Sequence, residues 1–326
     1  MTKKNIGVIM GGYTSEAGIS MKSGQVVCET LNQERYNVYA LHLLKERWVG
    51  ILEDGTEQEL DRADFSLNTP NGKIHFDCVF NAIHGSPGEN GYIQAYLELL
   101  GIPQTSCDMY QSALTYNKRD CLAVLRSYGI KTAKFHYLNK GDHADPEAIV
   151  AKVGLPCFVK ANKAGSSFGI SKVNHIKDLP AAIETSFKED DEILIESFLD
   201  GTEVSVGVIT WKGEVTVLPI TEIVSENDFF DYEAKYQGKS QEITPARITA
   251  EEERKVTEVA ERIYRILRMK GFSRSEFIFV NGEPHLLEMN TVPGLTKESI
   301  LPQQAGVAGI SLEELFGNAI EEALKS

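Results

Sequence analysis

The amino-acid sequence predicts a mixed α/β protein with more than one domain. The chain has 326 residues, and at roughly 150 residues per domain this length predicts about two domains, with three as the alternative. Over the first hundred residues, short apolar runs alternate with helix-like stretches, which is typical of a parallel α/β sheet. Further along, a short loop rich in Gly and Ser at 161–169 joins two apolar runs, which favours an antiparallel hairpin.

Composition and charge exclude several classes of protein. Hydrophobic residues make up 42% and charged residues 25% of the chain, which is ordinary for a globular protein and argues against disorder, collagen and coiled coil. The 33 Lys and Arg against 47 Asp and Glu leave a net charge of −14. Because a phosphate backbone requires a basic face, we expect no nucleic-acid partner. A bound polyanion would need a few well-placed cations.

The apolar runs are too short to cross a membrane. None approaches the ~20 residues that a bilayer requires, so we expect no membrane span. The first run, at 6–10, is also too short for a signal peptide and leads into Gly11 and Gly12, which indicates a first strand. The five cysteines, an odd number without C-x-x-C spacing, indicate buried free thiols in a reducing cytosol.

The pattern of the first hundred residues predicts strands at 6–10, 36–43 and 78–83, with helices near 20–31 and 93–100. The carboxyl ends of parallel strands meet at one edge of a sheet, and ligands bind in the loops there. The loop that follows the third strand is therefore a candidate site.

The remainder of the chain is predicted to contain further helices and strands, at 116–128, 156–160, 170–173, 204–211, 215–220, 277–280 and 285–289. Thr249 with Glu252, and Ser311 with Glu314, form capping boxes that start two more helices. The segment 225–247 is long, polar and aperiodic, which indicates a functional lid or a disordered loop.

The segment K-A-N-K-A-G-S-S-F-G, from Lys160 to Gly169, is a candidate phosphate-binding loop. Glycines let backbone N–H groups approach phosphates, and Ser and Lys add donors and charge. The loop is not a Walker A motif, because Gly165 is not followed at the right spacing by Lys and Ser or Thr, and it is not the dinucleotide-binding fingerprint, because it lies between two strands. An ordinary hairpin turn is an equal alternative.

An Asn-Gly turn at 281–282 joins the predicted strands at 277–280 and 285–289 into a hairpin, and polar side chains lie on and beside its strands. Alternate residues of a strand share a face, so Arg274 lies beside Glu276, and Glu288 beside Asn290. A strict two-residue turn would place the two glutamates on opposite faces, whereas a three-residue loop or a bulge would bring them together. Two carboxylates and an amide oxygen suit Mg²⁺ shared with phosphates. We therefore predict an odd loop or a bulge; the alternative is a solvated polar face.

Two loops rich in turn-forming residues are further candidates. T-V-P-G-L-T at 291–296 directly follows the charged hairpin and could present backbone N–H groups to an oxyanion. H-G-S-P-G-E-N-G at 84–91 follows a predicted strand. The alternative for each is a plain turn.

In this order, these segments resemble the D-alanine–D-alanine ligase family of the ATP-grasp enzymes. The motifs are G-G-x-x-S-E from Gly11, H-G-x-x-G-E-x-G from His84, G-S-S-x-G from Gly165, D-Y-x-x-K-Y from Asp231 and E-x-N-T-x-P-G-x-T-x-x-S from Glu288. The resemblance covers nearly the whole chain. It implies a three-domain ATP-grasp architecture: a Rossmann-like parallel α/β domain over 1–103, a central subdomain with the glycine-rich loop over 104–195, and a C-terminal subdomain over 196–326.

The resemblance also implies an activity, the ADP-forming ligation of two D-alanines for peptidoglycan precursor synthesis. ATP would convert one D-alanine to a D-alanyl phosphate, and the amine of the second would displace phosphate. Enzymes of this family are typically cytoplasmic homodimers that use ATP and two Mg²⁺ ions, with Mn²⁺ as an alternative, and often a monovalent cation such as K⁺.

Each site residue takes its role from the resemblance. The ATP site would comprise Lys118, Lys160, Ser166, Ser167, Glu196, Phe198, Leu199, Glu203 and Lys235. The metal ligands would be Glu276, Glu288 and Asn290. Arg274 and the Gly294 N–H would stabilise the oxyanion. The D-alanines would contact Glu16, His84, Lys235, Ser299 and Ile300. Ser166 and Tyr236 would link the two loops to Glu16 and close a lid that excludes water.

Departures and rival interpretations remain. Glu276 stands where the family usually has Asp, so the backbone or the metal must absorb an extra methylene. His84 could be a hydrogen-bonded loop histidine, and Glu16 could cap a helix. The rival functions are a sister ligase that uses D-lactate or D-serine as acceptor, an ATP-grasp ligase for other carboxylates, and a nucleotide-binding regulatory protein without turnover. Tyr236 argues against the lactate type.

Overall fold

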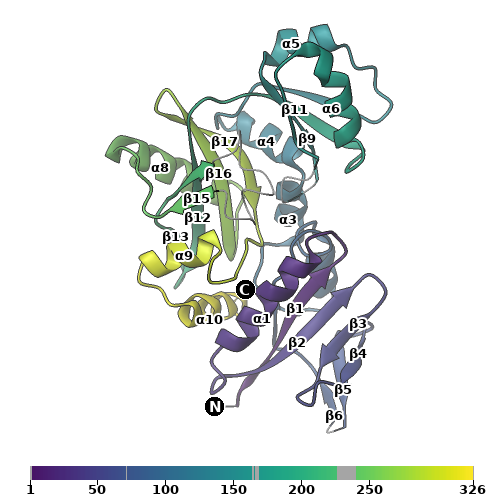
Figure 1. Cartoon of the computed structure of the whole chain (residues 1–326). Coiled ribbons are helices and arrows are strands. Elements are labelled where there is room, and N and C mark those ends of the chain that lie inside the picture. The colour runs from purple at the N-terminus through teal and green to yellow at the C-terminus, as the bar shows by residue number, and fades with distance from the viewer. Residues whose placement is uncertain (1, 71, 164, 166–168, 226–239, 326) are drawn as a thin grey trace.

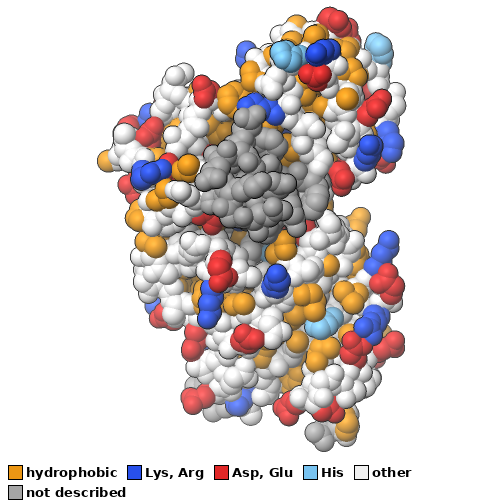
Figure 2. Space-filling view, in the orientation of Figure 1, with side chains coloured by type: hydrophobic (Ala, Val, Ile, Leu, Met, Phe, Trp, Pro, Cys, Tyr) orange, Lys and Arg blue, Asp and Glu red, His pale blue; other side chains and the backbone are white. Residues whose placement is uncertain are grey.

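The computed structural model describes the chain except for residues 1, 71, 164, 166–168, 226–239 and 326. The described strands form three sheets with seven, four and six strands, and helices pack against them (Figure 1). The mixed α/β fold class is therefore confirmed. No helix in the described part of the chain is long and apolar enough to cross a bilayer. Acidic and basic side chains are intermixed over the face seen in Figure 2.

The first sheet is built from the N-terminal residues. Its elements are β1 (Lys4–Gly12), α1 (Ala17–Thr30), β2 (Tyr36–Leu44), β3 (Trp48–Ile51), β4 (Glu57–Asp61), β5 (Ser66–Thr69), β6 (Gly72–Ile74), β7 (Cys78–Asn81) and α2 (Tyr92–Leu99). β1 pairs with β2 and β7 in parallel, as predicted. β3 to β6 extend the sheet as antiparallel hairpins that the sequence reading did not anticipate. Only three residues separate β2 from β3, too few for a parallel crossover.

The second sheet belongs to the central part of the chain. Its elements are α3 (Met109–Tyr116), α4 (Lys118–Ser127), β8 (Phe135–Asn139), α5 (Pro146–Val153), β9 (Cys157–Ala161), β10 (Ser171–Val173), a 3₁₀ turn (Ile176–Asp178), α6 (Leu179–Ser186) and β11 (Glu192–Ser197). The predicted antiparallel pairing of β9 with β10 is confirmed. The single helix predicted at 116–128 is wrong at its start. Asn117 leaves the helical conformation and its side chain accepts from the Asp120 N–H, so it ends α3 and caps α4.

The third sheet lies in the C-terminal part. Its elements are β12 (Thr202–Trp211), β13 (Glu214–Val217), β14 (Thr221–Ser225), β15 (Ser240–Ile243), α8 (Ala250–Ile266), β16 (Phe272–Val280), β17 (Glu283–Asn290), α9 (Ile300–Val307) and α10 (Leu312–Ala323). Both predicted capping boxes are confirmed, at the starts of α8 and α10. α8 packs on the sheet through a buried stripe that includes Val256, Ala260 and Ile263.

The hairpin of β16 and β17 resolves the question of which face its side chains share. Val280 pairs with Glu283 across a two-residue turn, and a bulge between Glu276 and Phe277 shifts the register. Glu276 therefore lies opposite Glu288. Residues directly opposite each other in an antiparallel pair share a face. The predicted bulge is confirmed, and it brings the charged side chains together.

One apolar core joins the N-terminal sheet to the C-terminal helices. The Phe80 ring of β7 lies 5.5 Å from the Phe316 ring of α10 and 6.4 Å from the Phe272 ring of β16. The central sheet has a core of its own, and its strand β11 runs through Ser197. The division of the chain at 103 and 195 stays a prediction. All five cysteines are free, as predicted, and burial raises the pKa of Cys121 to about 12.

Candidate active site

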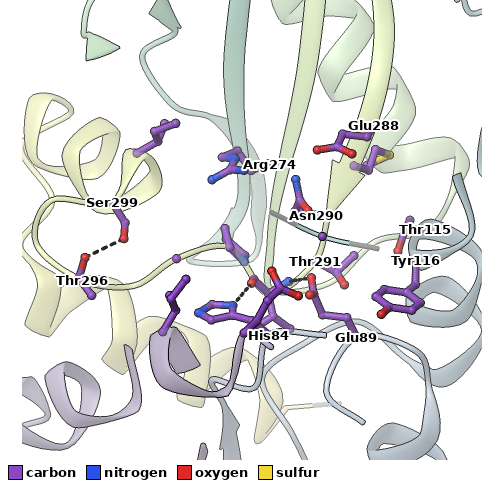
Figure 3. Close-up of a pocket in the computed structure, with 18 of the residues that line it drawn as sticks. His84, Glu89, Thr115, Tyr116, Arg274, Glu288, Asn290, Thr291, Thr296 and Ser299 are labelled. Atoms are coloured by element: carbon purple, nitrogen blue, oxygen red, sulfur yellow. Dashed lines mark hydrogen bonds between the residues drawn. The ribbon is translucent and has the colours of Figure 1, made fainter. Parts of the chain in front are cut away.

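A pocket opens among segments that come from all three sheets (Figure 3). Loops after β1 and β7 form one wall, the α3–α4 junction another, and the β16–β17 hairpin with the loop that follows it a third, while Gly165 and Glu242 of β15 also line the pocket. The predicted site residues that line this pocket are Glu16, His84, Lys118, Arg274, Glu288, Asn290, Gly294, Ser299 and Ile300. The structure thus brings together residues that lie up to 284 positions apart in the chain.

Arg274 carries a buried positive charge into the pocket. Its Nε donates to Glu276 Oε1 at 2.7 Å, and the same oxygen accepts from Ser205 Oγ at 3.3 Å. Burial alone would lower the pKa of Arg274, but Glu276, with Glu288 and a weaker contribution from Glu242, holds that pKa above its ordinary value. The guanidinium is therefore charged at every pH at which the protein is folded.

The oxygen donors of the hairpin fit a hard divalent cation. Glu276 is only 6% exposed, and its Oε2 has no hydrogen-bond partner among the described residues. Glu288, opposite it in register, pairs with Lys118 Nζ at 3.3 Å, and Asn290 lies opposite Arg274. In the described part of the chain, no group of three or more His, Cys, Asp or Glu could hold a metal. Two carboxylates and one amide suit a metal whose remaining ligands are phosphate oxygens and water.

Lys118, at the start of α4, is held in place by Asn162. The Asn162 side chain is 1% exposed; its Oδ1 accepts from the Arg119 N–H at 2.8 Å, and its Nδ2 donates to Asn117 Oδ1 at 2.8 Å. The same Nδ2 donates to Glu192 Oε2 at 2.9 Å. This single amide thus ties the first turn of α4 to the segment that leads into the glycine-rich loop. The sequence reading missed it, since Asn162 there was one polar residue in a loop.

Several other predicted ATP-site residues do not line this pocket. Lys160 Nζ forms an ion pair with Glu196, which is 2% exposed. Burial would lower the pKa of Lys160, but Glu196 outweighs it, with smaller effects from Glu288 and Glu203, and the pKa is raised. Phe198 packs against the Phe158 ring at 6.2 Å. Lys160, Glu196, Phe198, Leu199, Glu203 and Glu276 do not line the pocket.

Glu16 meets the glycine-rich loop. It stands at the N-cap of α1, but its side chain does not cap the helix. A Cβ added to Gly165 would lie 2.6 Å from Glu16 Oε1, so a larger residue here would displace the Glu16 carboxylate. The predicted links from Glu16 to the two loops involve Ser166 and Tyr236, which lie outside the described residues, as do Ser167 and Lys235.

His84 is hydrogen-bonded at both ring nitrogens. Nδ1 lies 2.8 Å from the Val292 carbonyl oxygen, and Nε2 lies 2.9 Å from Ser23 Oγ. Burial lowers the pKa of His84, against the effects of the Val292 carbonyl and Glu16. The ring is therefore neutral near pH 7, and neither nitrogen is left over for a substrate.

Gly294 and Ser299, both predicted site residues, lie against each other. A Cβ added to Gly294 would come within 2.7 Å of Ser299 Oγ, so a larger residue here would push against the Ser299 side chain. Ser299 Oγ hydrogen-bonds to Thr296 Oγ1 at 2.9 Å, and Ile300 begins α9 (Figure 3). The start of this helix therefore faces the pocket.

Comparison with known proteins places the whole chain in one family. Residues 5–107 match the family model for the D-ala D-ala ligase N-terminus, and residues 124–321 match the model for the D-ala D-ala ligase C-terminus. A D-alanine–D-alanine ligase from Flavobacterium johnsoniae is 66% identical over 98% of this chain and 99% of its own length. The chain belongs to the D-alanine–D-alanine ligase family.

Further relatives agree with this assignment. A D-alanine–D-alanine ligase from Christiangramia forsetii is 59% identical over 99% of each chain. Among solved structures, the VanG D-Ala:D-Ser ligase from Enterococcus faecalis is 30% identical, with a TM-score of 0.87 over 99% of this chain and 100% of that one. A D-alanine–D-alanine ligase from Bacillus anthracis, solved in complex with ATP, is 28% identical, with a TM-score of 0.80 over 99% of this chain and 98% of that one. The expected enzyme class, an ATP-dependent ligase of peptidoglycan synthesis, is confirmed at the level of the family.

Further residues that line the pocket were not predicted as site residues from the sequence. Glu89 Oε2 accepts from the Gly85 N–H at 2.7 Å, and Oε1 accepts from the Val292 N–H at 3.3 Å. Burial, with the nearby Glu16, raises the pKa of Glu89 to about 7. Its place in the H-G-x-x-G-E-x-G motif was a usable signal. Tyr116 and Glu242 also line the pocket, and no motif pointed to them.

Proposed function

We propose that this chain joins two D-alanines through a D-alanyl phosphate, with the chemistry in the pocket described above. The observation that carries the proposal is the bulge in the β16–β17 hairpin. It sets Glu276 opposite Glu288 and Arg274 opposite Asn290, directly before the turn that holds Gly294. A buried cation, oxygen ligands for a metal and a backbone N–H thus converge on one cavity.

The chemistry of this reaction requires such a site. A carboxylate is a poor electrophile, so ATP first phosphorylates it, and charge then builds up on phosphoryl oxygens and on a tetrahedral oxyanion. Preorganised donors stabilise such charge best in a site shielded from water. Arg274, whose charge is fixed by Glu276, and the N–H of Gly294 are the donors that we assign to the oxyanion.

The proposed ATP site combines Lys118, which lines the pocket, with residues that do not line it. Lys118 and Lys160 would hold the phosphates; in the structure they form ion pairs with Glu288 and Glu196. Glu196 Oε1 is buried without a hydrogen-bond partner among the described residues, so the amino group of adenine would satisfy it. The remaining proposed ATP contacts are Ser166, Ser167, Phe198, Leu199, Glu203 and Lys235.

We assign Glu276, Glu288 and Asn290 as the residues that would hold two Mg²⁺ ions. When bound, these ions would neutralise charge on the phosphates. Mn²⁺ as a substitute and K⁺ as an additional ion belong to the same proposal. Glu276 contributes the orphan oxygen Oε2, which supports its assignment although it replaces the usual Asp.

For the two D-alanines, we propose that Glu16 receives the ammonium group of the first. His84 would lie near that ammonium group, and Lys235, Ser299 and Ile300 would hold the carboxylate region of the second D-alanine. We further propose that the chain acts in the cytoplasm as a homodimer, in the three domains predicted from the sequence, without nucleic-acid or membrane partners. Acceptor preference for D-alanine is favoured by the names of the relatives at 53–66% identity.

A coupled assay of ADP release tests the function directly. We expect release with Mg²⁺ and ATP to depend on D-alanine and to yield D-alanyl-D-alanine by mass spectrometry. D-serine or D-lactate, each offered with limiting D-alanine near pH 7, should give little mixed product. ADP release that ignores D-alanine would refute the ligase, and preferred formation of a mixed product would refute the acceptor assignment.

A further inference from the structure

The turn that carries Gly294 is fastened by side chains from a distant part of the chain. Val292 and Leu295 flank Gly294 after β17, whereas Ser23 lies on α1 and His84 follows β7. The Val292 carbonyl bonds to His84 Nδ1 at 2.8 Å, as the dashed line in Figure 3 shows. His84 Nε2 bonds to Ser23 Oγ at 2.9 Å, and Ser23 Oγ accepts from the Leu295 N–H at 3.3 Å.

The direction of each hydrogen bond follows from its partners. A carbonyl oxygen only accepts, so His84 Nδ1 carries the hydrogen that bonds to Val292. In the neutral ring Nε2 must then accept, and Ser23 supplies the hydroxyl hydrogen. The oxygen of Ser23 keeps a lone pair for the Leu295 N–H. These hydrogen bonds run from the Leu295 N–H through Ser23 and His84 to the Val292 carbonyl on the same turn. We call this closed path of hydrogen bonds the circuit.

Burial makes this circuit stiff. Ser23 is fully buried and His84 is 6% exposed. Hydrogen bonds strengthen in a medium of low dielectric constant, and a buried polar group that loses its partner pays its full desolvation cost. Peptide groups on both sides of Gly294 are therefore anchored, and Glu89 adds a third contact at the Val292 N–H. The N–H of Gly294 lies between these anchors.

We propose that Ser23 and His84 are positioning residues that hold the Gly294 N–H at the place where the oxyanion forms. This inference rests on the proposed role of Gly294. Both nitrogens of His84 are spent on the circuit, so His84 acts through the turn and transfers no proton to substrate. Ser23, which was not predicted as a site residue from the sequence, belongs to this circuit as much as His84 does.

The first test compares Ser23→Ala with Ser20→Ala. Ser20 lies one turn earlier on α1 and is equally buried, but its hydroxyl joins the Gly11 N–H of β1 at 2.9 Å to the carbonyl of Ala82, the residue after β7, at 2.8 Å. Both variants lose a buried hydroxyl, and only Ser23→Ala opens the circuit. Because small misplacements of a catalytic group cost up to about 100-fold, we expect kcat to fall roughly 10- to 100-fold in Ser23→Ala with KM for ATP within about twofold. Ser20→Ala should keep kcat within about threefold at a similar loss of Tm.

The second test separates positioning from proton transfer at His84. In His84→Asn the amide nitrogen can occupy the Nδ1 position and still donate to Val292; in His84→Gln the amide can occupy the Nε2 position and still accept from Ser23. Neither amide transfers protons. We expect each variant to keep activity within about 100-fold of wild type, with both limbs of the pH–rate profile unmoved. Adding Ser23→Ala to His84→Asn should cost little more, since the circuit is already open.

Two results would overturn the proposal. Equal kcat losses in Ser23→Ala and Ser20→Ala would show that Ser23 has a merely structural role. Loss of one limb of the pH–rate profile in both His84 variants would assign proton transfer to His84 instead. Failure of the proposed function is distinguishable, because wild-type protein would then give no D-alanine-dependent ADP release at all.

Discussion

Arg274→Ala tests the oxyanion assignment and the electrostatics of the pocket at once. The change removes a guanidinium whose Nε lies 2.7 Å from Glu276 Oε1. Removing one donor from an oxyanion site typically costs about 10²–10³ in kcat. Arg274 is a charged donor in a shielded site, so we expect a loss of roughly 10³ or more.

The same change should also destabilise the protein. Glu276 is 6% exposed, Oε2 already lacks a hydrogen-bond partner among the described residues, and Oε1 would keep only Ser205 at 3.3 Å. Removing one partner of a buried ion pair costs about 3–5 kcal/mol, because the other charge stays buried. At about 2 °C of Tm per kcal/mol for a large chain, Tm should fall by roughly 6–10 °C.

A double variant separates the two effects. Arg274→Ala with Glu276→Gln leaves no buried charge, so it should regain most of the lost Tm while kcat stays low. Coupled ADP release measures kcat, and differential scanning fluorimetry measures Tm. Wild-type turnover in Arg274→Ala would refute the oxyanion role. An unchanged Tm in that variant would refute the account of the buried pair.

Three further predictions concern other parts of the site. Asn162→Asp keeps the acceptor for the α4 N–H but loses the donor to Asn117. KM for ATP, measured by initial-rate kinetics, should therefore rise about tenfold. An unchanged KM would show that this contact does not affect phosphate binding. Burial raises the pKa of Glu89 to about 7, above its unfolded value, so folding binds a proton and Glu89 should lower stability as pH rises from about 4.5 to 7. Glu89→Ala should show a smaller fall in Tm over that window, and an identical fall would contradict the shift. Chelation with EDTA should abolish D-alanine-dependent ADP release. It should move the Tm of nucleotide-free protein by no more than about 1 °C, because Lys118 and Arg274 already pair with the hairpin carboxylates. A large drop in Tm would show a structural metal.

Local rules of the chain predicted part of this fold, including the parallel strands β1, β2 and β7, and missed β3 to β6. Thr249 with Glu252 marked the start of α8, and strand parity led to the prediction of an odd loop or a bulge, which the structure has as a bulge beside Glu276. Each of these signals lies within a few residues of the feature that it specifies. The break at Asn117 shows the limit of such reasoning, because helical periodicity continues on both sides of a residue that caps one helix and ends another.

The polar contacts of the site were beyond the reach of sequence periodicity. Ser23 and His84 are 61 positions apart, and His84 and Val292 are 208 positions apart. Such pairings depend on how three sheets pack, which no local pattern encodes. Motif order brought most of the pocket residues into view, yet it gave no sign that both ring nitrogens of His84 bond to protein groups.

The core shared by Phe80 and Phe316 has a consequence for folding during synthesis on the ribosome. The ribosome makes the N-terminal sheet first, and α1 covers part of one of its faces, but α10, which packs into the same core, comes last, more than two hundred residues later. At about 5–20 residues per second, the part of that face next to Phe80 waits roughly 10–50 s for α10. The nascent N-terminal sheet is therefore a natural client for chaperones, and a chain that stops before α10 should aggregate rather than yield a smaller folded protein.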